Sequence, residues 1–400
     1  MNFSQLISPT EVTVFFSEYW GKTPLIIQKR ARDLYDELLT VDQIDHILTT
    51  MWLRSPAVRL VRSGRELGLG YYTKSFNWGS KTFTDVIDVP QMISAYQQGV
   101  TIVIEAVHRY WKPLAMFCES ITKELSLRLQ ANVYVSPPNG QGLATHYDTH
   151  DVLIMQVYGS KHWRLFEQTI ELPNKKFRFD HGKTAVGNLI REVTLSPGDL
   201  IYIPRGVGHE ATTSELASVH ITIGLEFYQW IDLFKRAIEQ LENNAEFRES
   251  MPPYFLQRQG LSEDEKEHLR FLLARLNELV ASSQLVQEIQ DQFLSAQMPT
   301  YDGLFSTILN LDSIGPETEI RVRHNVLYKI EEQADKVVVM FADKTISFPI
   351  HVKRALEVIC NKQILAVGKI PYLNEPGRIL LAKVLAREGF VSVADDHKTS

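Results

Sequence analysis

The segment NVYVSPPNGQGLATHYDTHDVLIMQVYGSKHWRLF, residues 132–166, contains the pattern that decides the fold. Short runs rich in valine, isoleucine and aromatic residues alternate with turn residues, which is typical of β-strands. We expect strands within residues 100–106, 132–136, 150–159, 162–167, 191–195, 199–204 and 218–227, and one helix at about 112–129. Short strands at this spacing predict a closed or sandwiched antiparallel β structure.

Two histidines and one aspartate in this region have the spacing of a metal site. His146 and Asp148 are two residues apart, so on a strand both side chains leave the same face. A third ligand is expected from SPGDLIYIPRGVGH, residues 196–209, where a glycine-aspartate turn leads into a strand and His209 follows it. We therefore predict that His146, Asp148 and His209 bind one metal ion.

This ligand set indicates a kind of chemistry. Two imidazoles and one carboxylate leave three metal positions open, which an iron centre needs in order to hold a bidentate 2-oxo acid together with dioxygen. A hydrolytic zinc site needs only one open position. A His-x-Asp pair alone occurs by chance in many strands. Joined to the G-D-x4-P-x-G-x2-H pattern of residues 198–209, it favours the iron centre.

Other polar residues of the region have plainer explanations. His150 continues the alternation of His146 and Asp148, and it either contacts substrate or satisfies a local hydrogen bond. Local hydrogen bonds are also expected for Asp151, His162, His181 and His220. Five basic residues have two equally good explanations: each lines a substrate groove, or each lies in solvent on a strand face or at a strand end. They are Arg59, Arg62, Arg65, His108 and Arg109. Trp163 and Phe166 are expected in the core.

Composition places the chain among folded globular proteins. Its 400 residues are 44% hydrophobic and 22% charged, and they should form two or three domains. The N-terminus lacks a basic region followed by an apolar stretch, so we expect a cytoplasmic protein without a membrane segment. A net charge of -6 makes direct nucleic-acid binding an unfavoured function. The two cysteines, Cys118 and Cys360, are expected to be buried thiols.

Three domains are expected along the chain, within residues 1–232, 233–315 and 316–400. The first should open with a helix capped by Ser8 and a second helix that begins at Thr40. Long amphipathic helices follow, the clearest beginning at Ser262 with Glu265 completing a capping box. They suggest a packing or dimerising module. The last region is read as strand, hairpin, helix, short strand, helix and strand, an order that fits a winged-helix-like domain.

The motifs at residues 132–166 and 196–209 resemble the paired cupin motifs of JmjC-type oxygenases, and the longer run resembles the ribosomal-oxygenase branch of that family. The resemblance extends to EYWGKTPLII at residues 18–27, the central helices and the C-terminal region. It implies an α+β fold, a double-stranded β-helix with N-terminal helices, a helical dimerisation-type module and a winged-helix-like end. It also implies that Lys161 holds the distal carboxylate of 2-oxoglutarate, with Tyr134 and Thr222 lining the same pocket.

The activity implied by the resemblance is Fe(II)- and 2-oxoglutarate-dependent hydroxylation of a protein side chain, with O2 as the second cosubstrate and a ribosomal protein as a possible target. A homodimer is the expected assembly. Two alternatives stay open at this point: an N-methyl lysine demethylase with the same iron chemistry, and a non-catalytic metal-binding cupin scaffold. A scaffold would gain little from a buried lysine, which is worth keeping only with an anionic partner.

Overall fold

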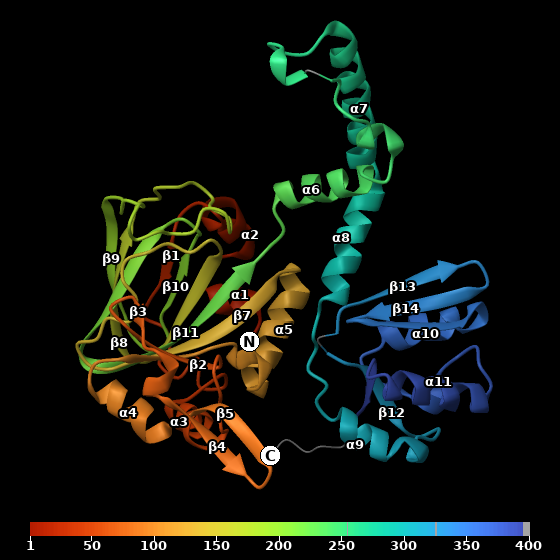
Figure 1. Ribbon diagram of the computed structural model, residues 1–400. Coiled ribbons are helices and arrows are strands. Elements are labelled where there is room, and N and C mark those ends of the chain that lie inside the picture. The colour runs from red at the N-terminus through yellow and green to blue at the C-terminus, as the bar shows by residue number, and fades with distance from the viewer. Residues whose placement is uncertain (254, 325, 395–400) are drawn as a thin grey trace. The chain divides into compact units, whose positions relative to one another are not determined.

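The computed structural model describes residues 1–253, 255–324 and 326–394. The chain divides into two compact units, Met1–Phe227 and a second that begins at Tyr228. Helices and strands contribute to both units (Figure 1), which confirms the α+β class. Residues 395–400 of the predicted C-terminal domain lie outside the described residues. The division into three domains stays a prediction.

The first unit is built on a nine-stranded antiparallel sheet of order β1-β10-β8-β11-β7-β6-β2-β3, with β9 paired to β8. Its strands are β1 Leu25–Ile27, β2 Val58–Arg62, β3 Arg65–Glu66, β6 Thr101–Ile104, β7 Arg128–Ser136, β8 Asp151–Phe166, β9 Leu189–Leu195, β10 Leu200–Ile203 and β11 Gly208–Glu226. Two segments expected as separate strands, 150–159 and 162–167, are one continuous strand, β8.

The long strands β8 and β11 roll the sheet. The first part of β8 pairs with β10 and its last part with β9, whereas β11 follows nearly all of its length. Register shifts between Thr213 and Ser218 and between Val219 and His220 mark bulges in β11. Bulges bend a strand and increase its twist, so the inner face of the sheet becomes concave.

Alternate residues of β8 belong to two different apolar clusters. Leu153 and Met155 join the main core, which also holds α1 and α5 side chains, while Val152 and Ile154 join a smaller cluster with Trp163 and residues of β10. Each strand residue therefore buries its side chain on one side or the other, the two-residue period expected of a strand covered on both faces.

Short helices and a hairpin surround the sheet (Figure 1). They are α1 Phe3–Ile7, α2 Val12–Val14, α3 Val41–Thr50, α4 Val89–Gln97 and α5 Lys112–Leu125, with the hairpin β4 Thr73–Trp78 and β5 Lys81–Ile87. Thr40 caps α3 as expected. The helix start expected at Ser8 is wrong: Ser8 ends α1, whose own capping box is formed by Asn2 and Gln5. The capping box therefore belongs to α1, and α2 begins without a side-chain cap.

The second unit begins with helices α6 Trp230–Leu241, α7 Glu263–Ala281, α8 Ser283–Ser295 and α9 Leu304–Leu309. Ser262 caps α7 and Glu265 completes the capping box, as the sequence predicts. No residue of α7 is buried within its unit, and its apolar side chains Leu269, Phe271 and Leu273 are exposed. None of the described helices is both long enough and apolar enough to cross a bilayer.

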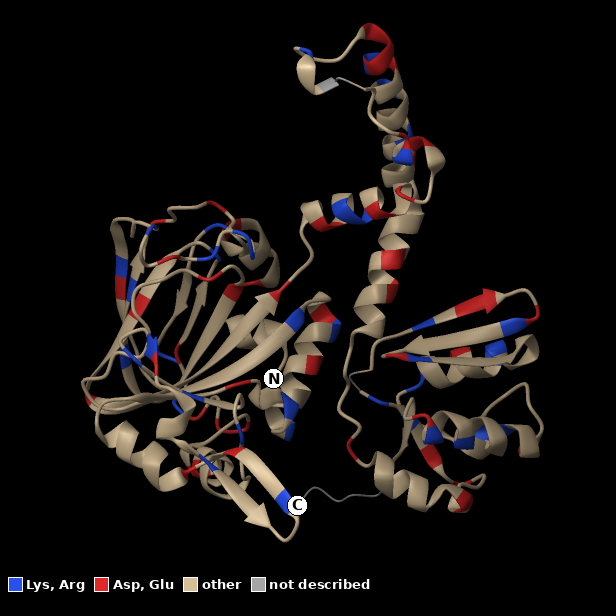
Figure 2. Cartoon of the chain, in the orientation of Figure 1, with Lys and Arg blue, Asp and Glu red and all other residues tan. Residues whose placement is uncertain are grey.

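The end of the second unit contains β12 Glu319–Val322, β13 Tyr328–Gln333, β14 Lys336–Phe341, β15 Lys344–Pro349, α10 Lys353–Asn361, β16 Leu365–Ala366, α11 Glu375–Arg387 and β17 Val391–Val393. This order matches the prediction except that two strands, β12 and β13, precede the hairpin of β14 and β15, where one was expected. These elements form two three-stranded sheets and share one apolar core. Basic and acidic residues are mixed along α10 and α11 (Figure 2), in keeping with the nearly balanced charge of this region.

Candidate metal centre

A cavity of about 300 Å³ lies within the rolled sheet of the first unit. Strands β7, β8 and β11 form its walls, and the loop of residues 137–150 closes one side. It is lined by Arg59, Thr101, Gln130, Asn132, Tyr134, Gly142, Leu143, His146, Asp148, His150, Val152, Ile154, Lys161, Trp163, His209, Glu210, Ala211, His220, Thr222 and Gly224. All six residues predicted for metal and cosubstrate binding are among them.

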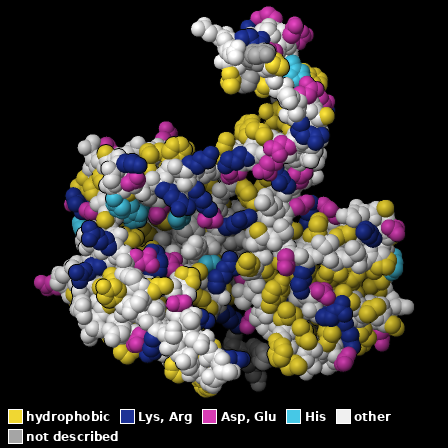
Figure 3. All heavy atoms as spheres, in the orientation of Figure 1, with side chains coloured by type: hydrophobic (Ala, Val, Ile, Leu, Met, Phe, Trp, Pro, Cys, Tyr) yellow, Lys and Arg dark blue, Asp and Glu magenta, His cyan; other side chains and the backbone are white. Residues whose placement is uncertain are grey.

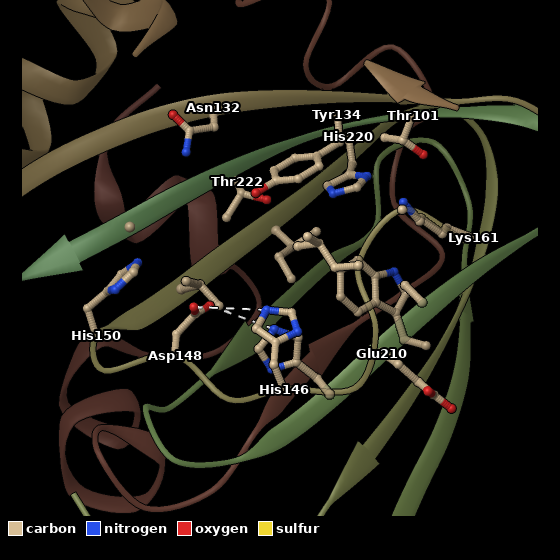
Figure 4. A pocket seen from close by; sticks show the side chains of 18 of the residues that line it. Thr101, Asn132, Tyr134, His146, Asp148, His150, Lys161, Glu210, His220 and Thr222 are labelled. Carbon is tan, nitrogen blue, oxygen red and sulfur yellow. Dashed lines mark ion pairs between the residues drawn. The ribbon is translucent and has the colours of Figure 1, made fainter. Parts of the chain in front are cut away.

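The structure brings His146, Asp148 and His209 together, with one potential ligand atom from each within 4.8 Å of the others. The Nε2 atoms of His146 and His209 lie 4.0 and 3.7 Å from the carboxylate oxygens of Asp148 (Figure 4). The predicted reason was wrong, because His146 and Asp148 belong to a loop and not to a strand. Instead of lying on the expected strand, His146 forms an isolated β-bridge with His209.

The backbone fixes which nitrogen of each imidazole faces the aspartate. Nδ1 of His146 lies 2.8 Å from the carbonyl oxygen of Ala144, and Nδ1 of His209 lies 3.1 Å from that of Val207. A carbonyl oxygen can only accept, so Nδ1 carries the proton in both rings and donates it. Nε2 is then left with its lone pair toward Asp148, which is the form of histidine that binds a metal.

The electrostatics of the cluster favour an ionised Asp148 and an unprotonated His209. Burial disfavours the charge of Asp148, but the nearby His146, His209 and His150 hold the pKa of Asp148 below its ordinary value. Burial, reinforced by His146 and opposed by Asp148, lowers the pKa of His209 to about 4. An ionised carboxylate with unprotonated imidazoles is the state that coordinates a cation.

Lys161 lies at the other end of the cavity from Asp148 (Figure 4). Its side chain is 4% exposed, and its ammonium donates to Ser136 Oγ at 3.0 Å and lies 5.9 Å from the ring centre of Trp163. It forms no ion pair with any residue that the structure describes. Burial lowers its pKa to about 7. A buried ammonium without a counterion is costly, so the position suits an anionic ligand.

Two further ring nitrogens beside Lys161 have no hydrogen-bond partner among the described residues: His220 Nδ1 and Trp163 Nε1. The His220 ring stacks on Tyr134 with 4.8 Å between centroids and meets Trp163 edge-on at 5.5 Å. Burial, and then Lys161, hold the pKa of His220 well below its ordinary value. Buried polar atoms normally have partners, so these nitrogens also point to a ligand.

Tyr134 was predicted for this wall, but sequence reasoning missed its neighbours on β7 and β6. Asn132 and Thr101 line the cavity, and Ser136 receives hydrogen bonds from both Lys161 and Thr101. Residues 132, 134 and 136 share one face of β7, so the two-residue period of this strand could have identified Asn132 and Ser136 once Tyr134 was placed. Thr101 had no such signal, because it lies on β6, outside the motif that carries the ligands.

The competing histidines and aspartate of the region lie in different places. His150 lines the cavity, and its ring packs against Gly224, where a Cβ atom would lie 2.9 Å from Nε2. Asp151 accepts hydrogen bonds from the Tyr202 hydroxyl and the Arg205 amide, and is fully buried away from the metal residues. His162 contacts Thr194 Oγ1 on the exposed side of the sheet.

Of the five basic residues considered for a substrate groove, one lines the cavity and four do not. His108 accepts a hydrogen bond from the Ala131 amide and, with Arg109, does not line the cavity. Arg59 does line it, held by ion pairs with Glu105 and Glu66. Arg62 and Arg65 are exposed and lie outside the cavity lining.

Comparison with known proteins defines the class. Residues 107–233 match the JmjC domain family, and this match covers β7 to β11 and every predicted ligand. The chain therefore carries a JmjC domain on the rolled sheet described above.

Two curated relatives show which JmjC proteins this chain is similar to. A bifunctional lysine-specific demethylase and histidyl-hydroxylase NO66 of Aedes aegypti is 30% identical over 294 residues, which are 70% of this chain and 44% of the relative. Ribosomal oxygenase 1 of Danio rerio is 26% identical over 74% of this chain and 56% of its own length. The chain thus spans about half the length of the curated relatives it matches.

A solved structure extends the likeness of fold to nearly the whole chain. The ribosomal oxygenase YcfD of Escherichia coli, in complex with cobalt and 2-oxoglutarate, matches with a TM-score of 0.54 and 16% identity, over 97% of this chain and 99% of that one. At this identity the likeness concerns the fold. It confirms the expected resemblance to the ribosomal-oxygenase architecture.

Proposed function

We propose that this protein is an Fe(II)- and 2-oxoglutarate-dependent oxygenase that hydroxylates a protein side chain. The observation that carries the proposal is the pairing, in one cavity, of a His-Asp-His cluster with a buried lysine that has no described counterion. The cluster suits a divalent metal, and the lysine suits a dicarboxylate reaching toward it. The cluster and Lys161 lie at opposite ends of the cavity, so neither neutralises the charge of the other directly. A ligand that spans the cavity would explain why both are buried.

The donor set fits iron. His146 and His209 offer Nε2 and Asp148 offers a carboxylate oxygen, and this two-histidine, one-carboxylate set is the one used by non-haem iron oxygenases. When bound, the iron supplies the oxidising chemistry that replaces a C–H bond by C–OH while 2-oxoglutarate and O2 become succinate and carbon dioxide. The chain's own task is to hold the ligands, orient one carbon of the substrate and keep water from the site.

The far end of the cavity fits 2-oxoglutarate. The Lys161 ammonium would pair with the distal carboxylate, and the indole N–H of Trp163 would add a donor, as would His220 Nδ1 in the tautomer that carries its proton there. Hydroxyls of Tyr134 and Thr222 line the space between this end and Asp148 (Figure 4). Val152 and Ile154 supply apolar wall, which reduces water around the charges.

Two other functions remain as outcomes of the test. An N-methyl lysine demethylase would use the same residues, and the printed name of the Aedes relative includes both activities. A metal-binding scaffold would keep the three ligands but gains nothing from Lys161. The relatives named ribosomal oxygenase support a ribosomal protein as substrate. We retain the cytoplasmic setting that the sequence analysis expects as part of the proposal.

The proposal is tested by O2-dependent formation of succinate from 2-oxoglutarate, with Fe(II) and purified ribosomal proteins or methylated lysine peptides. We expect turnover that is lost in His146→Ala, with His162→Ala as a matched control because this exposed histidine contacts Thr194 instead. A product heavier by one oxygen identifies a hydroxylase, and release of formaldehyde identifies a demethylase. Iron binding without turnover on any substrate supports the scaffold.

We also propose that the helical module of residues 233–315, with α6 leading into it, pairs two copies of the chain. Trp230, Phe234 and Ile238 recur at helical spacing on α6 and are 82%, 44% and 55% exposed. Apolar side chains reach the surface along this helical part (Figure 3). An exposed apolar helix stripe of this kind marks a protein interface. Light scattering should give a dimer mass for the protein and a monomer mass for a Trp230→Ser, Phe234→Ser variant; a monomeric parent protein would refute this.

A further inference from the structure

A polar contact between side chains next to the metal ligands joins the two segments that carry them. The β-bridge between His146 and His209 is antiparallel, so the residues on either side of it, Thr145 and Glu210, lie opposite each other. The Thr145 hydroxyl donates to Glu210 Oε2 at 2.5 Å. The link therefore closes one end of a ladder that has a single bridge.

The other end of the same ladder is held by backbone alone. The Gly206 amide donates to the Asp148 carbonyl at 3.0 Å, and the bridge itself consists of two hydrogen bonds of 3.1 and 2.7 Å between His146 and His209. One bridged pair is a short ladder, and a segment with few hydrogen bonds opens more readily than one in a long ladder. Metal ligands need precise placement by the groups around them.

Glu210 is itself anchored to the sheet. It pairs in register with Arg164 of β8, whose Nη1 donates to Glu210 Oε1 at 2.7 Å. Arg164 in turn pairs with Glu192 of β9. The Glu210 side chain is 15% exposed, whereas that of Glu192 is 47% exposed. Both carboxylate oxygens of Glu210 are thus engaged, one by the sheet and one by the ligand loop.

Glu210 lines the cavity, but it is not one of the three clustered metal-binding side chains. Its carboxylate points away from the cavity (Figure 4), and the metal cluster among the described residues consists of the other three side chains. Its neighbours Thr145 and Arg164 take no part in the cavity lining. The contact accordingly acts on the ligands through the backbone.

We infer that Thr145, Glu210 and Arg164 form a clamp that positions His146 against His209, and so sets the affinity of the metal site; this inference rests on the proposed function. Thr145 is next to His146 and Glu210 is next to His209, so each half of the clamp transmits its position across one peptide unit. Groups that orient metal ligands typically change metal affinity about 10- to 100-fold when they are lost.

The test is titration of the full-length protein with Co(II) in the absence of O2 and 2-oxoglutarate, followed by the visible d–d absorption, so that no turnover is required. Thr145→Val keeps the shape of the side chain and removes its hydroxyl. We expect it to bind Co(II) about tenfold more weakly, with a weaker and shifted absorption. Thr145→Ser restores the hydroxyl and should bind within about twofold of the parent protein.

Glu192→Gln is the matched control, since it removes a partner of Arg164 without touching Thr145, and it should leave Co(II) binding unchanged. If Thr145→Val does not fold, as judged by circular dichroism of the metal-free protein, Glu210→Gln replaces it and is expected to weaken binding similarly. Equal affinity of the parent and the folded clamp variant refutes the clamp. Absence of any Co(II) site in the parent protein refutes the proposed metal site as well, and only that outcome does so.

Discussion

At the scale of one residue, the buried Lys161 suits an anionic ligand but destabilises the folded protein when that ligand is absent. Its ammonium is nearly inaccessible and has a serine hydroxyl as its described partner. Desolvation of a charge without a counterion destabilises the folded state, and the same desolvation lowers the pKa of Lys161 to about 7. The residue is therefore best explained by the anion that it would bind, not by the fold that it occupies.

Replacing Lys161 with methionine should stabilise the ligand-free protein while abolishing tight binding of 2-oxoglutarate. Exchange of a buried unpaired charge for an apolar side chain of similar length should raise the free energy of unfolding by about 1–4 kcal/mol at pH 7. Denaturant unfolding of both proteins without ligand measures this. Ser136→Ala, which removes the lysine's hydroxyl partner, should instead destabilise. A less stable Lys161→Met protein would contradict the account.

The stability of the ligand-free protein should rise with pH above about 7. The folded-state pKa of Lys161, about 7, lies below the ordinary 10.5, so between these values the unfolded chain binds a proton that the folded chain lacks. Stability rises with pH wherever the unfolded state binds more protons, here by up to about 1.4 kcal/mol per pH unit from this group. Unfolding at pH 7, 8 and 9 should show a slope that is reduced in Lys161→Met; equal slopes would argue against a perturbed lysine.

Binding of 2-oxoglutarate should have the opposite pH dependence. The dicarboxylate prefers the charged form of Lys161, which the free protein loses as pH rises through about 7. The dissociation constant should therefore increase by up to about tenfold per pH unit above that point. Calorimetric titration between pH 6.5 and 8.5 with Mn(II) as a redox-silent metal checks this. Lys161→Met should bind weakly at every pH.

At the scale of elements, the ligand loop depends on the turn at Gly206. Its φ is +85°, and a Cβ atom there would lie 2.7 Å from the Ile170 carbonyl oxygen. Its amide also holds the Asp148 carbonyl. We expect Gly206→Ala to lose about 1–3 kcal/mol of stability and to weaken metal binding, because Asp148 must shift. Gly99→Ala, also at positive φ but with open space around it, separates backbone strain from the local clash: it should leave metal affinity unchanged.

Strands and helix caps could be predicted from the sequence, whereas the conformation of the loops between them could not. The strands were found because alternation and β-branched residues mark them, and the cap of α7 because Ser262 and Glu265 stand three apart. His146 and Asp148 were chosen correctly for cavity lining but for the wrong reason, since a loop brings them together. Loop geometry depends on distant contacts, such as the Gly206 amide, that local patterns do not encode.

At the scale of the whole molecule, the predicted site residues all belong to one of the two compact units. Every predicted metal and cosubstrate residue lies in the unit Met1–Phe227, where one concave sheet gathers residues from Tyr134 to Thr222. The pairings of β8, β11 and β7 that close the cavity join residues far apart in sequence. This is why Ser136, Thr101 and His220 escaped prediction as neighbours of Lys161: their proximity is a property of the closed sheet.

The central claim is that one cavity holds iron at His146, Asp148 and His209 and 2-oxoglutarate between that iron and Lys161. Anaerobic titration of the Fe(II) protein with 2-oxoglutarate tests it most directly, because a 2-oxo acid that chelates iron produces a visible charge-transfer absorption. We predict that this absorption saturates in the parent protein, is absent in His146→Ala, and requires at least about 30-fold more 2-oxoglutarate in Lys161→Met. A parent protein that binds Fe(II) without developing the absorption, or a Lys161→Met titration identical to that of the parent, would contradict the account.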